Sequence, residues 1–171
     1  MNDLRVITTG GTIDKIYFDR LSDFRIGEPQ IGELLREANV TFSWAVTALM
    51  RKDSLDLDDA DRRAILEAVG GCEEECILVT HGTDTMVETA RVLRAVTDRS
   101  IVLTGAMQPA TQRDSDAVFN IGFAIGVLRT SGPGVRIAMN GQVLTPASAR
   151  KNRAQNRFEP DRSDVPSEES P

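Results

Sequence analysis

Residues 4–12 read LRVITTGGT, and residues 76–83 read CILVTHGT. Both segments begin with a short apolar run of the kind found in buried parallel strands. Each run then enters a polar turn that carries a threonine, Thr12 in the first and Thr83 in the second. In open α/β sheets with strand order 2-1-3-4-5, the first and third strands flank the ligand-binding crevice at their carboxyl ends. We therefore predict that these segments are the first and third strands, and that the two threonines face each other.

Strand and helix patterns alternate along the rest of the chain. A helical pattern begins at Glu28-Pro29, a strand is expected over 40–49, and a second helical pattern follows the acidic run Asp56 to Asp61. After the segment at 76–83, the expected elements are a helix over 87–96, a strand over 101–103, a helix over 115–129 and a strand over 135–139. Strands separated by helices imply βαβ units and a mainly parallel sheet. The predicted fold class is α/β, a three-layer flavodoxin-like or Rossmann-like sheet with helices on both faces.

Two stretches do not fit this alternation. Residues 14–27 are polar, irregular and long for a connection, which is typical of a functional loop or lid. The pattern also breaks down beyond Gly141, and residues 159–171 are acidic and bear Pro and Ser. We predict one catalytic domain over residues 1–158, which is long enough for a single core, and a disordered tail over 159–171.

Composition narrows the class of partner. The net charge of -6 argues against nucleic acid and anionic membranes, and no apolar run approaches the ~18 residues that cross a bilayer. The amino terminus has no secretory pattern, so we expect a cytoplasmic protein. We expect Cys72 and Cys76 to be reduced thiols rather than zinc ligands. The carboxylates in the run Asp56 to Asp61 suit the start of a helix better than a metal site. We expect no metal and no cofactor.

A threonine hydroxyl becomes a nucleophile only when a base or a positioned network takes its proton. Thr83 has Asp84 beside it, while Thr12 is followed closely by Asp14, Lys15 and Tyr17. Other readings stay open. Gly10-Gly11-Thr12 could be a backbone anion cradle, Thr83-Asp84-Thr85 could cap a helix, and His81 could act as a general base or hold the backbone.

The motifs taken together resemble the bacterial-type L-asparaginase family. The segments that carry the resemblance are TGGTI at 9–13, THGTDTMVETA at 80–90 and LTGAMQP at 103–109, followed by Ser115-Asp116 and Phe119-Asn120. The resemblance runs from about Leu4 to Lys151 and covers only the family's N-terminal domain, as in a short-chain form. It implies an L-asparagine amidohydrolase with a threonine nucleophile and an acyl-enzyme. Because glutamine is only one methylene longer than asparagine, a minor glutaminase activity stays open.

The resemblance also implies residue roles. Thr12 would be the nucleophile, Thr83 would form a second triad with Lys151, and Asp84 would bind the substrate α-amino group. Ser54 would bind the substrate carboxylate, and backbone amides around Gly11, Gly82 and Thr83 are oxyanion-hole candidates.

Two departures from the family pattern affect the site. The family's loop tyrosine aligns with Phe24, so Tyr17 is the expected catalytic partner of Thr12, with Asp14 and Lys15 as alternatives. The family's smaller second domain, which supplies an acidic residue to a neighbouring subunit's site, has no counterpart here. We therefore expect a homo-oligomer, a dimer or tetramer, that shields the site.

Two alternatives belong to other classes. One is a non-catalytic amino-acid-binding or regulatory domain derived from an amidase, which Phe24 and the short chain favour. The other is a phosphate-binding module built on Gly10-Gly11, which is weakened because the longer glycine-rich signatures are absent from the sequence. The small-molecule substrate L-asparagine remains the expected partner.

Overall fold

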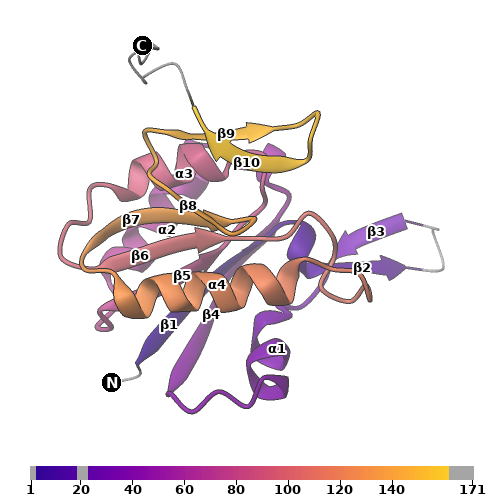
Figure 1. Ribbon diagram of the computed structural model, residues 1–171, viewed down its shortest axis with the longest axis horizontal. Helices are drawn as coiled ribbons and strands as arrows, with labels where there is room; N and C mark the ends of the chain where they lie inside the picture. Colours follow the sequence, from indigo (N-terminus) through magenta and orange to yellow (C-terminus); the bar gives the residue numbers. More distant parts are fainter. Residues whose placement is uncertain (1–2, 19–22, 162–171) are drawn as a thin grey trace, which may run out of the picture.

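The central element is a six-stranded sheet, seen in a computed structural model that describes residues 3–18 and 23–161 (Figure 1). Its strands, in spatial order, are β4 (Trp44–Lys52), β1 (Leu4–Gly10), β5 (Cys76–Thr80), β6 (Ser100–Thr104), β7 (Gly134–Met139) and β8 (Gln142–Leu144). The first five are parallel, and β8 pairs antiparallel with β7. The parallel strands thus have the order 2-1-3-4-5, which confirms the prediction.

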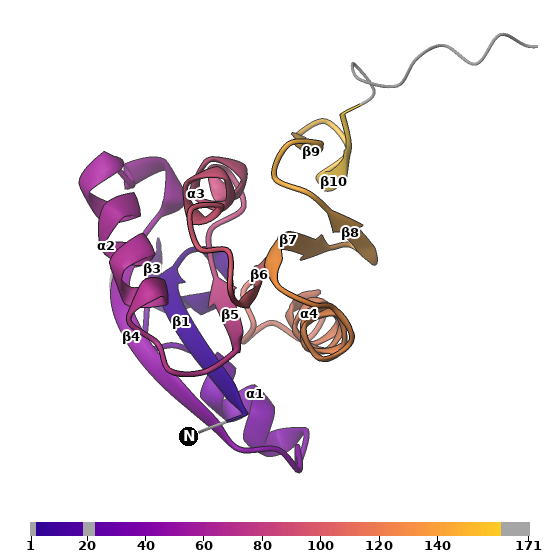
Figure 2. The same ribbon diagram turned by 90° about the vertical axis from the view of Figure 1, so that its left-hand side faces the viewer.

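Helices cover both faces of this sheet (Figure 2). They are α1 (Ile31–Glu37), α2 (Asp59–Gly70), α3 (Met86–Leu93) and α4 (Ala117–Thr130). α2 and α3 pack on one face and α1 and α4 on the other, and each face has its own cluster of buried side chains. The three-layer α/β prediction is confirmed.

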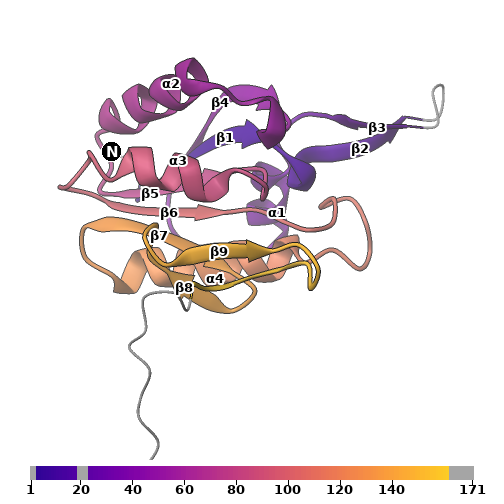
Figure 3. The same ribbon diagram turned by 90° about the horizontal axis from the view of Figure 1, so that it is seen from above.

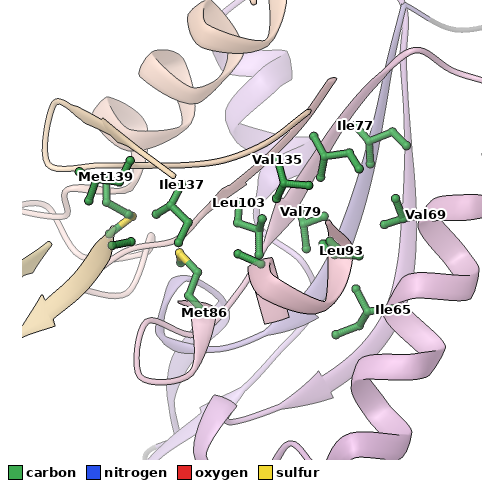
Figure 4. Packing of buried hydrophobic residues seen from close by; sticks show 14 of the residues in the cluster. Ile65, Val69, Ile77, Val79, Met86, Leu93, Leu103, Val135, Ile137 and Met139 are labelled. Carbon is green, nitrogen blue, oxygen red and sulfur yellow. The ribbon is translucent and has the colours of Figure 1, made fainter. Parts of the chain in front are cut away.

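The core between the sheet and helices α2 and α3 explains why the strands are apolar runs (Figure 4). Ile77 and Val79 of β5 and Leu103 of β6 are fully buried there, beneath Ile65 of α2 and Leu93 of α3. Strands covered on both faces have few positions for polar side chains. Each large aliphatic side chain buried in this way contributes ~1.5–3 kcal/mol relative to leaving it in water.

Residues 14–27, predicted to be an irregular loop, instead contain a β-hairpin that projects from the end of the sheet (Figure 3). Its strands β2 (Lys15–Phe18) and β3 (Asp23–Ile26) pair antiparallel and follow a 3-10 turn over Thr12–Asp14. Tyr17 lies opposite Phe24, and their rings meet edge to face at 5.5 Å. This cross-strand aromatic pair gives the hairpin a local reason to form.

Regular structure also continues beyond Gly141, where the sequence pattern predicted none. Strand β8 is followed by a second hairpin, β9 (Ala149–Asn152) and β10 (Arg157–Pro160). Phe158 anchors this hairpin, because its side chain is fully buried and its N–H donates to Asn140 Oδ1 at 2.9 Å. Strand β10 includes Glu159 and Pro160, which were assigned to the tail. Residues 162–171 of that predicted tail lie outside the described residues.

Several element boundaries differ from the predictions, most of all those of α1, β4 and α3, which ends at Leu93 rather than at residue 96. α1 begins at Ile31 rather than at Glu28-Pro29, and the N–H of its N-cap residue, Gln30, donates to Asp14 Oδ1. β4 begins at Trp44 rather than at residue 40, since Asn39 turns the chain with φ 48°.

The acidic run is a helix start, as predicted. The Asp58 carboxylate accepts from the Asp61 N–H, and the Asp61 carboxylate accepts from the Asp58 N–H. This reciprocal arrangement is a capping box, which satisfies two backbone donors that the first turn of a helix leaves free. Within residues 3–18 and 23–161, no helix is long and apolar enough to cross a membrane.

Candidate active site

The turns after β1, β5 and β4 meet at the carboxyl end of the sheet through two glycines. A Cβ on Gly11 would lie 2.5 Å from Gly82 Cα, and a Cβ on Gly82 would lie 2.6 Å from Ser54 Cβ. Gly11 also has φ +86°, a conformation that L side chains rarely adopt. Only glycine fits at these two positions, and their contact brings the turns that carry Thr12, Thr83 and Ser54 together.

The strand register sets the level along the sheet at which these turns begin. Thr8 of β1, Thr80 of β5 and Thr104 of β6 are partners across three adjacent strands. The Thr9 hydroxyl donates to the Thr80 carbonyl at 3.0 Å, and the His81 N–H donates to the Thr104 carbonyl at 2.9 Å. Both threonine turns therefore leave the sheet at the same level, as the sequence predicted for the first and third strands.

Thr83, Asp84 and Lys151 form a hydrogen-bonded cluster. Lys151 Nζ donates to Thr83 Oγ1 at 2.7 Å and to Asp84 Oδ1 at 3.0 Å. Thr83 is buried, and the Lys151 side chain is only 14% exposed. The structure thus brings together Thr83 and Lys151, which the resemblance paired in a second triad, and Asp84, which it assigned to the substrate α-amino group. Lys151 reaches the turn from β9, which Phe158 of β10 holds against the core.

Asp84 has a second cationic partner that sequence reasoning did not identify. Arg153, in the turn between β9 and β10, places Nη2 3.2 Å from Asp84 Oδ1. Its side chain is 67% exposed. The sequence offered no clear signal for this pair, because it depends on a hairpin that the pattern beyond Gly141 did not predict.

His81 supports the backbone of the Thr83 turn. It is fully buried, with Nδ1 2.7 Å from the Gly82 carbonyl oxygen and Nε2 2.8 Å from Thr89 Oγ1. A carbonyl can only accept, so Nδ1 carries the proton and Nε2 accepts from the Thr89 hydroxyl. Burial lowers the pKa of His81 from 6.5 to about 4, which keeps the ring neutral. Of the two readings, the structure favours the structural role over the general base.

Thr12 lies at the root of the hairpin and is half-buried. Two residues on, the buried Asp14 carboxylate accepts from the Gln30 N–H at 2.9 Å, and the Asp14 carbonyl accepts from the Gly27 N–H at 2.8 Å. Burial raises the pKa of Asp14 from 3.8 to about 6, although the Gln30 N–H and the Arg51 charge oppose the shift. Asp14 therefore ties both ends of the hairpin to the Thr12 turn.

Lys15 links the hairpin to the turn that carries Ser54. Its ammonium lies 3.1 Å from Asp53 Oδ2. Burial raises the pKa of Asp53, but the Leu55 N–H and Lys15 outweigh it and the pKa is lowered overall. The neighbouring Ser54 hydroxyl is buried and lacks a hydrogen-bond partner among the described residues. A hollow lined by Lys15, Phe24 and Asp53 opens beside it.

The candidate partners of Thr12 are placed differently. Asp14 and Lys15 are engaged by Gln30 and Asp53, as described above, whereas Tyr17 lies on β2 with 54% of its surface exposed. Its ring contacts Phe24, the position that aligns with the family's tyrosine. Gly11 also differs from expectation as an oxyanion-hole donor, because its N–H donates to the Lys52 carbonyl at 3.0 Å.

A network around Asp116 fixes the loop after β6 and was identified only as a motif. The Asp116 carboxylate accepts from the N–H groups of Met107 and Gln108 and from the Asn120 side-chain amide, with donor–acceptor distances of 2.9–3.0 Å. Asn120 also donates to the Gly105 carbonyl and accepts from the Asn140 N–H. The network joins the loop after β6 to the loop after β7, and so braces one wall of the site.

Comparisons with known proteins agree with this architecture. The family model "Asparaginase, N-terminal" matches residues 3–160. A probable periplasmic L-asparaginase of Haemophilus influenzae is 31% identical over 153 residues, which make up 83% of this chain and 44% of the relative. A glutaminase-asparaginase of Pseudomonas aeruginosa is 40% identical over 80 residues, 44% of this chain and 22% of that protein.

Solved structures give the same result. The thermostable L-asparaginase from Thermococcus kodakarensis matches with a TM-score of 0.81 and 26% identity, covering 92% of this chain and 50% of that one. The chain spans about half the length of the curated relatives that it matches.

Proposed function

The chain belongs to the asparaginase family, and we propose that it is an L-asparagine amidohydrolase that releases L-aspartate and ammonia. One observation carries the proposal. The Gly11–Gly82–Ser54 contact places the Thr12 turn, the Thr83–Lys151–Asp84 cluster and the Ser54 hydroxyl at one edge of the sheet. These groups supply a nucleophile, a polarised second threonine, a carboxylate and a free hydroxyl.

The substrate is proposed to lie between Asp84 and Ser54. The Asp84 carboxylate would bind the α-ammonium group through a charge-assisted hydrogen bond. The buried Ser54 hydroxyl, which has no hydrogen-bond partner within residues 3–18 and 23–161, would donate to the α-carboxylate, and this bond would remove the cost of an unsatisfied buried polar group. This placement directs the side-chain amide toward Thr12.

In the proposed reaction, Thr12 Oγ1 attacks the side-chain amide carbon and gives its proton to a base. The tetrahedral intermediate then breaks its C–N bond, and the nitrogen leaves as ammonia after taking up a proton. Water hydrolyses the resulting ester, which releases aspartate and restores the Thr12 hydroxyl. Backbone N–H groups of Gly82 and Thr83 are the proposed oxyanion donors, each worth ~3 kcal/mol in other systems.

We assign the proton transfer at Thr12 to Tyr17 and the polarisation of Thr83 to Lys151. Tyr17 is preferred because Asp14 and Lys15 are held by Gln30 and Asp53. Lys151 as an ammonium can only donate to Thr83, so it acts by its charge. A minor glutaminase activity is part of the proposal, since one extra methylene changes binding by only ~1–3 kcal/mol.

The test is ammonia release from L-asparagine and L-glutamine by the purified protein and by Thr12→Val and Thr83→Val. Threonine and valine have nearly the same shape, so the loss of turnover in both variants would report the loss of the hydroxyls. Thr130→Val is the matched control, because Thr130 Oγ1 donates to the Gly126 carbonyl at the end of α4. Near-native turnover by Thr12→Val would refute Thr12 as the nucleophile.

A non-catalytic amino-acid-binding domain is the second candidate. The observation that favours it is that Asp84 forms ion pairs with both Lys151 and Arg153. Binding of L-aspartate by a folded protein that hydrolyses neither amide would establish this alternative and exclude the enzyme.

We further propose a cytoplasmic homo-oligomer, a dimer or tetramer. Val118 and Phe119 on α4 are 62% and 60% exposed, and exposed apolar side chains of this size favour association with a second copy. Cys72 and Cys76 are free thiols, which suits a reducing compartment. Sedimentation velocity tests the assembly, and an active monomer at assay concentration would contradict it.

A further inference from the structure

Two cations share one oxygen of the carboxylate that is proposed to bind the substrate's α-ammonium group. Lys151 Nζ lies 3.0 Å and Arg153 Nη2 3.2 Å from Asp84 Oδ1. The two positive charges exceed the single negative charge of the carboxylate. An incoming ammonium group therefore meets a site that is locally positive rather than negative.

The two cations are held very differently. Lys151 is 14% exposed, lies on β9 and also donates to Thr83 Oγ1. Arg153 is 67% exposed and lies on the turn that follows β9. Removing Lys151 from Asp84 would also break the Thr83 contact, whereas Arg153 can swing into solvent at little cost. Arg153 is therefore the cation that a ligand can displace.

We propose that Arg153 is a specificity-determining residue whose guanidinium competes with the substrate's α-ammonium group for Asp84. It weakens the binding of ligands that carry an α-ammonium group relative to ligands that lack one. The inference rests on the proposed function, because it uses the same site. It goes further in naming a residue outside the proposed catalytic set that sets how strongly the site selects ligands with an α-ammonium group.

The size of the effect follows from the exposure of the pair. Exposed ion pairs contribute up to ~1 kcal/mol, and a ligand that must displace one loses at most about fivefold in affinity. The effect should therefore be two- to fivefold, enough to measure and too small to abolish binding. It should also shrink in high salt, which screens exposed charges.

The experiment compares L-aspartate with succinate, which has the same two carboxylates but no ammonium group. Dissociation constants for both ligands are measured by calorimetry on the wild type, Arg153→Ala and Arg153→Gln. Both variants should bind L-aspartate about two- to fivefold more tightly and succinate no more tightly than the wild type. Arg157→Ala is the matched control, since Arg157 is 53% exposed on the same hairpin and pairs with Glu159.

An unchanged aspartate-to-succinate ratio in the Arg153 variants would overturn the proposal. Weaker aspartate binding would also overturn it, and would make Arg153 a ligand for a substrate carboxylate. Ammonia release from L-asparagine is measured on the same samples. A shifted aspartate-to-succinate ratio without turnover would support the role of Arg153 and refute the amidohydrolase. Turnover with an unchanged ratio would support the amidohydrolase and refute the role of Arg153. If neither ligand binds, the proposal for Arg153 falls, and ammonia release alone decides the amidohydrolase.

Discussion

Thr83 and Thr12 follow neighbouring strands, but the structures around them differ. Thr83 is buried within a cluster that includes Lys151 and rests on the buried His81. Thr12 is half-buried at the root of a hairpin whose Tyr17 and Phe24 are 54% and 43% exposed. Both turns are anchored in the core, the Thr12 turn through the fully buried Ile13, but the Thr83 cluster is itself buried whereas the hairpin that follows Thr12 is exposed.

This difference suggests a division of labour. A polarising group works best when it is fixed before the substrate arrives, and the Thr83 side has that property. A nucleophile at the root of a projecting hairpin can be completed when the hairpin closes over a ligand.

The largest expected effect comes from removing the cation of the Thr83 side. Lys151→Met keeps the length of the side chain but deletes the ammonium group that contacts Thr83 and Asp84. We expect kcat for L-asparagine to fall by ~10²–10³-fold, the usual range for removing one fixed group that stabilises charge in the transition state. Arg150→Met is the control, because Arg150 neighbours Lys151 on β9 but pairs with Glu159. Turnover that survives in Lys151→Met would remove Lys151 from the mechanism.

The contact between the two sides is tested with Gly11→Ala. The new Cβ would lie 2.5 Å from Gly82 Cα, at a residue whose φ is +86°. We expect the free energy of unfolding to fall by ~2–4 kcal/mol, measured in urea, because strain and overlap add. Gly126→Ala in α4 is the control. A Cβ there meets nothing within 4 Å, and a helix-interior alanine should raise stability by ~0.5–1 kcal/mol. A neutral Gly11→Ala would show that the turns can separate.

The sequence was sufficient to predict the parts of the molecule that the core dictates. Buried parallel strands are apolar runs, so β1, β5, β6 and β7 and their order followed from the sequence pattern. The two hairpins could not be predicted in the same way. Within β9 and β10 only Ala149 and Phe158 are buried, and β3 is largely exposed. Their strands depend on cross-strand pairs rather than on an apolar face.

The candidate site shows the same limit. Thr12 and Thr83 follow predictable strands, so their proximity followed from topology. Lys151 was assigned by family resemblance, and its contact with Thr83 depends on a hairpin that the sequence pattern did not reveal. The Arg153–Asp84 pair depends on the same hairpin. Long-range packing, rather than local propensity, decides which cations reach the carboxylate.

The two sides should also respond to pH in opposite directions. The pKa of Asp14 is raised from 3.8 to about 6, so its stabilising contribution is present below pH 3.8 and is lost as pH rises through about 6. The pKa of His81 is lowered from 6.5 to about 4, so its contribution is present above pH 6.5 and is lost as pH falls through about 4. Between about pH 4 and 6 the two effects offset each other.

The variant Asp14→Asn should separate the pH effect of Asp14 from that of His81. The amide oxygen can still accept from the Gln30 N–H, but the buried charge is gone. We expect the variant to match the wild type near pH 4 and to exceed its free energy of unfolding by ~1–3 kcal/mol near pH 7. Urea unfolding across pH 4–7 gives the comparison. Asp98→Asn is the control, because Asp98 is 73% exposed. A constant difference between Asp14→Asn and the wild type would show that Asp14 does not titrate in this range.

The smallest expected effect concerns the ion pair that joins the hairpin to the Ser54 turn. Lys15 and Asp53 are 28% and 33% exposed, so their pair contributes up to ~1 kcal/mol. In Lys15→Met the hairpin loses this tie to the turn that orients the substrate carboxylate, and we expect kcat/KM for L-asparagine to fall about two- to fivefold at low salt. Added salt screens the wild-type pair, so the two proteins should converge as NaCl rises. Lys52→Met is the matched control, because Lys52 pairs with Asp61 on α2 rather than with the hairpin side chains. A loss in Lys15→Met that does not change with salt would mean that Lys15 acts on Thr12 itself, as the alternative partner of the nucleophile, rather than through Asp53.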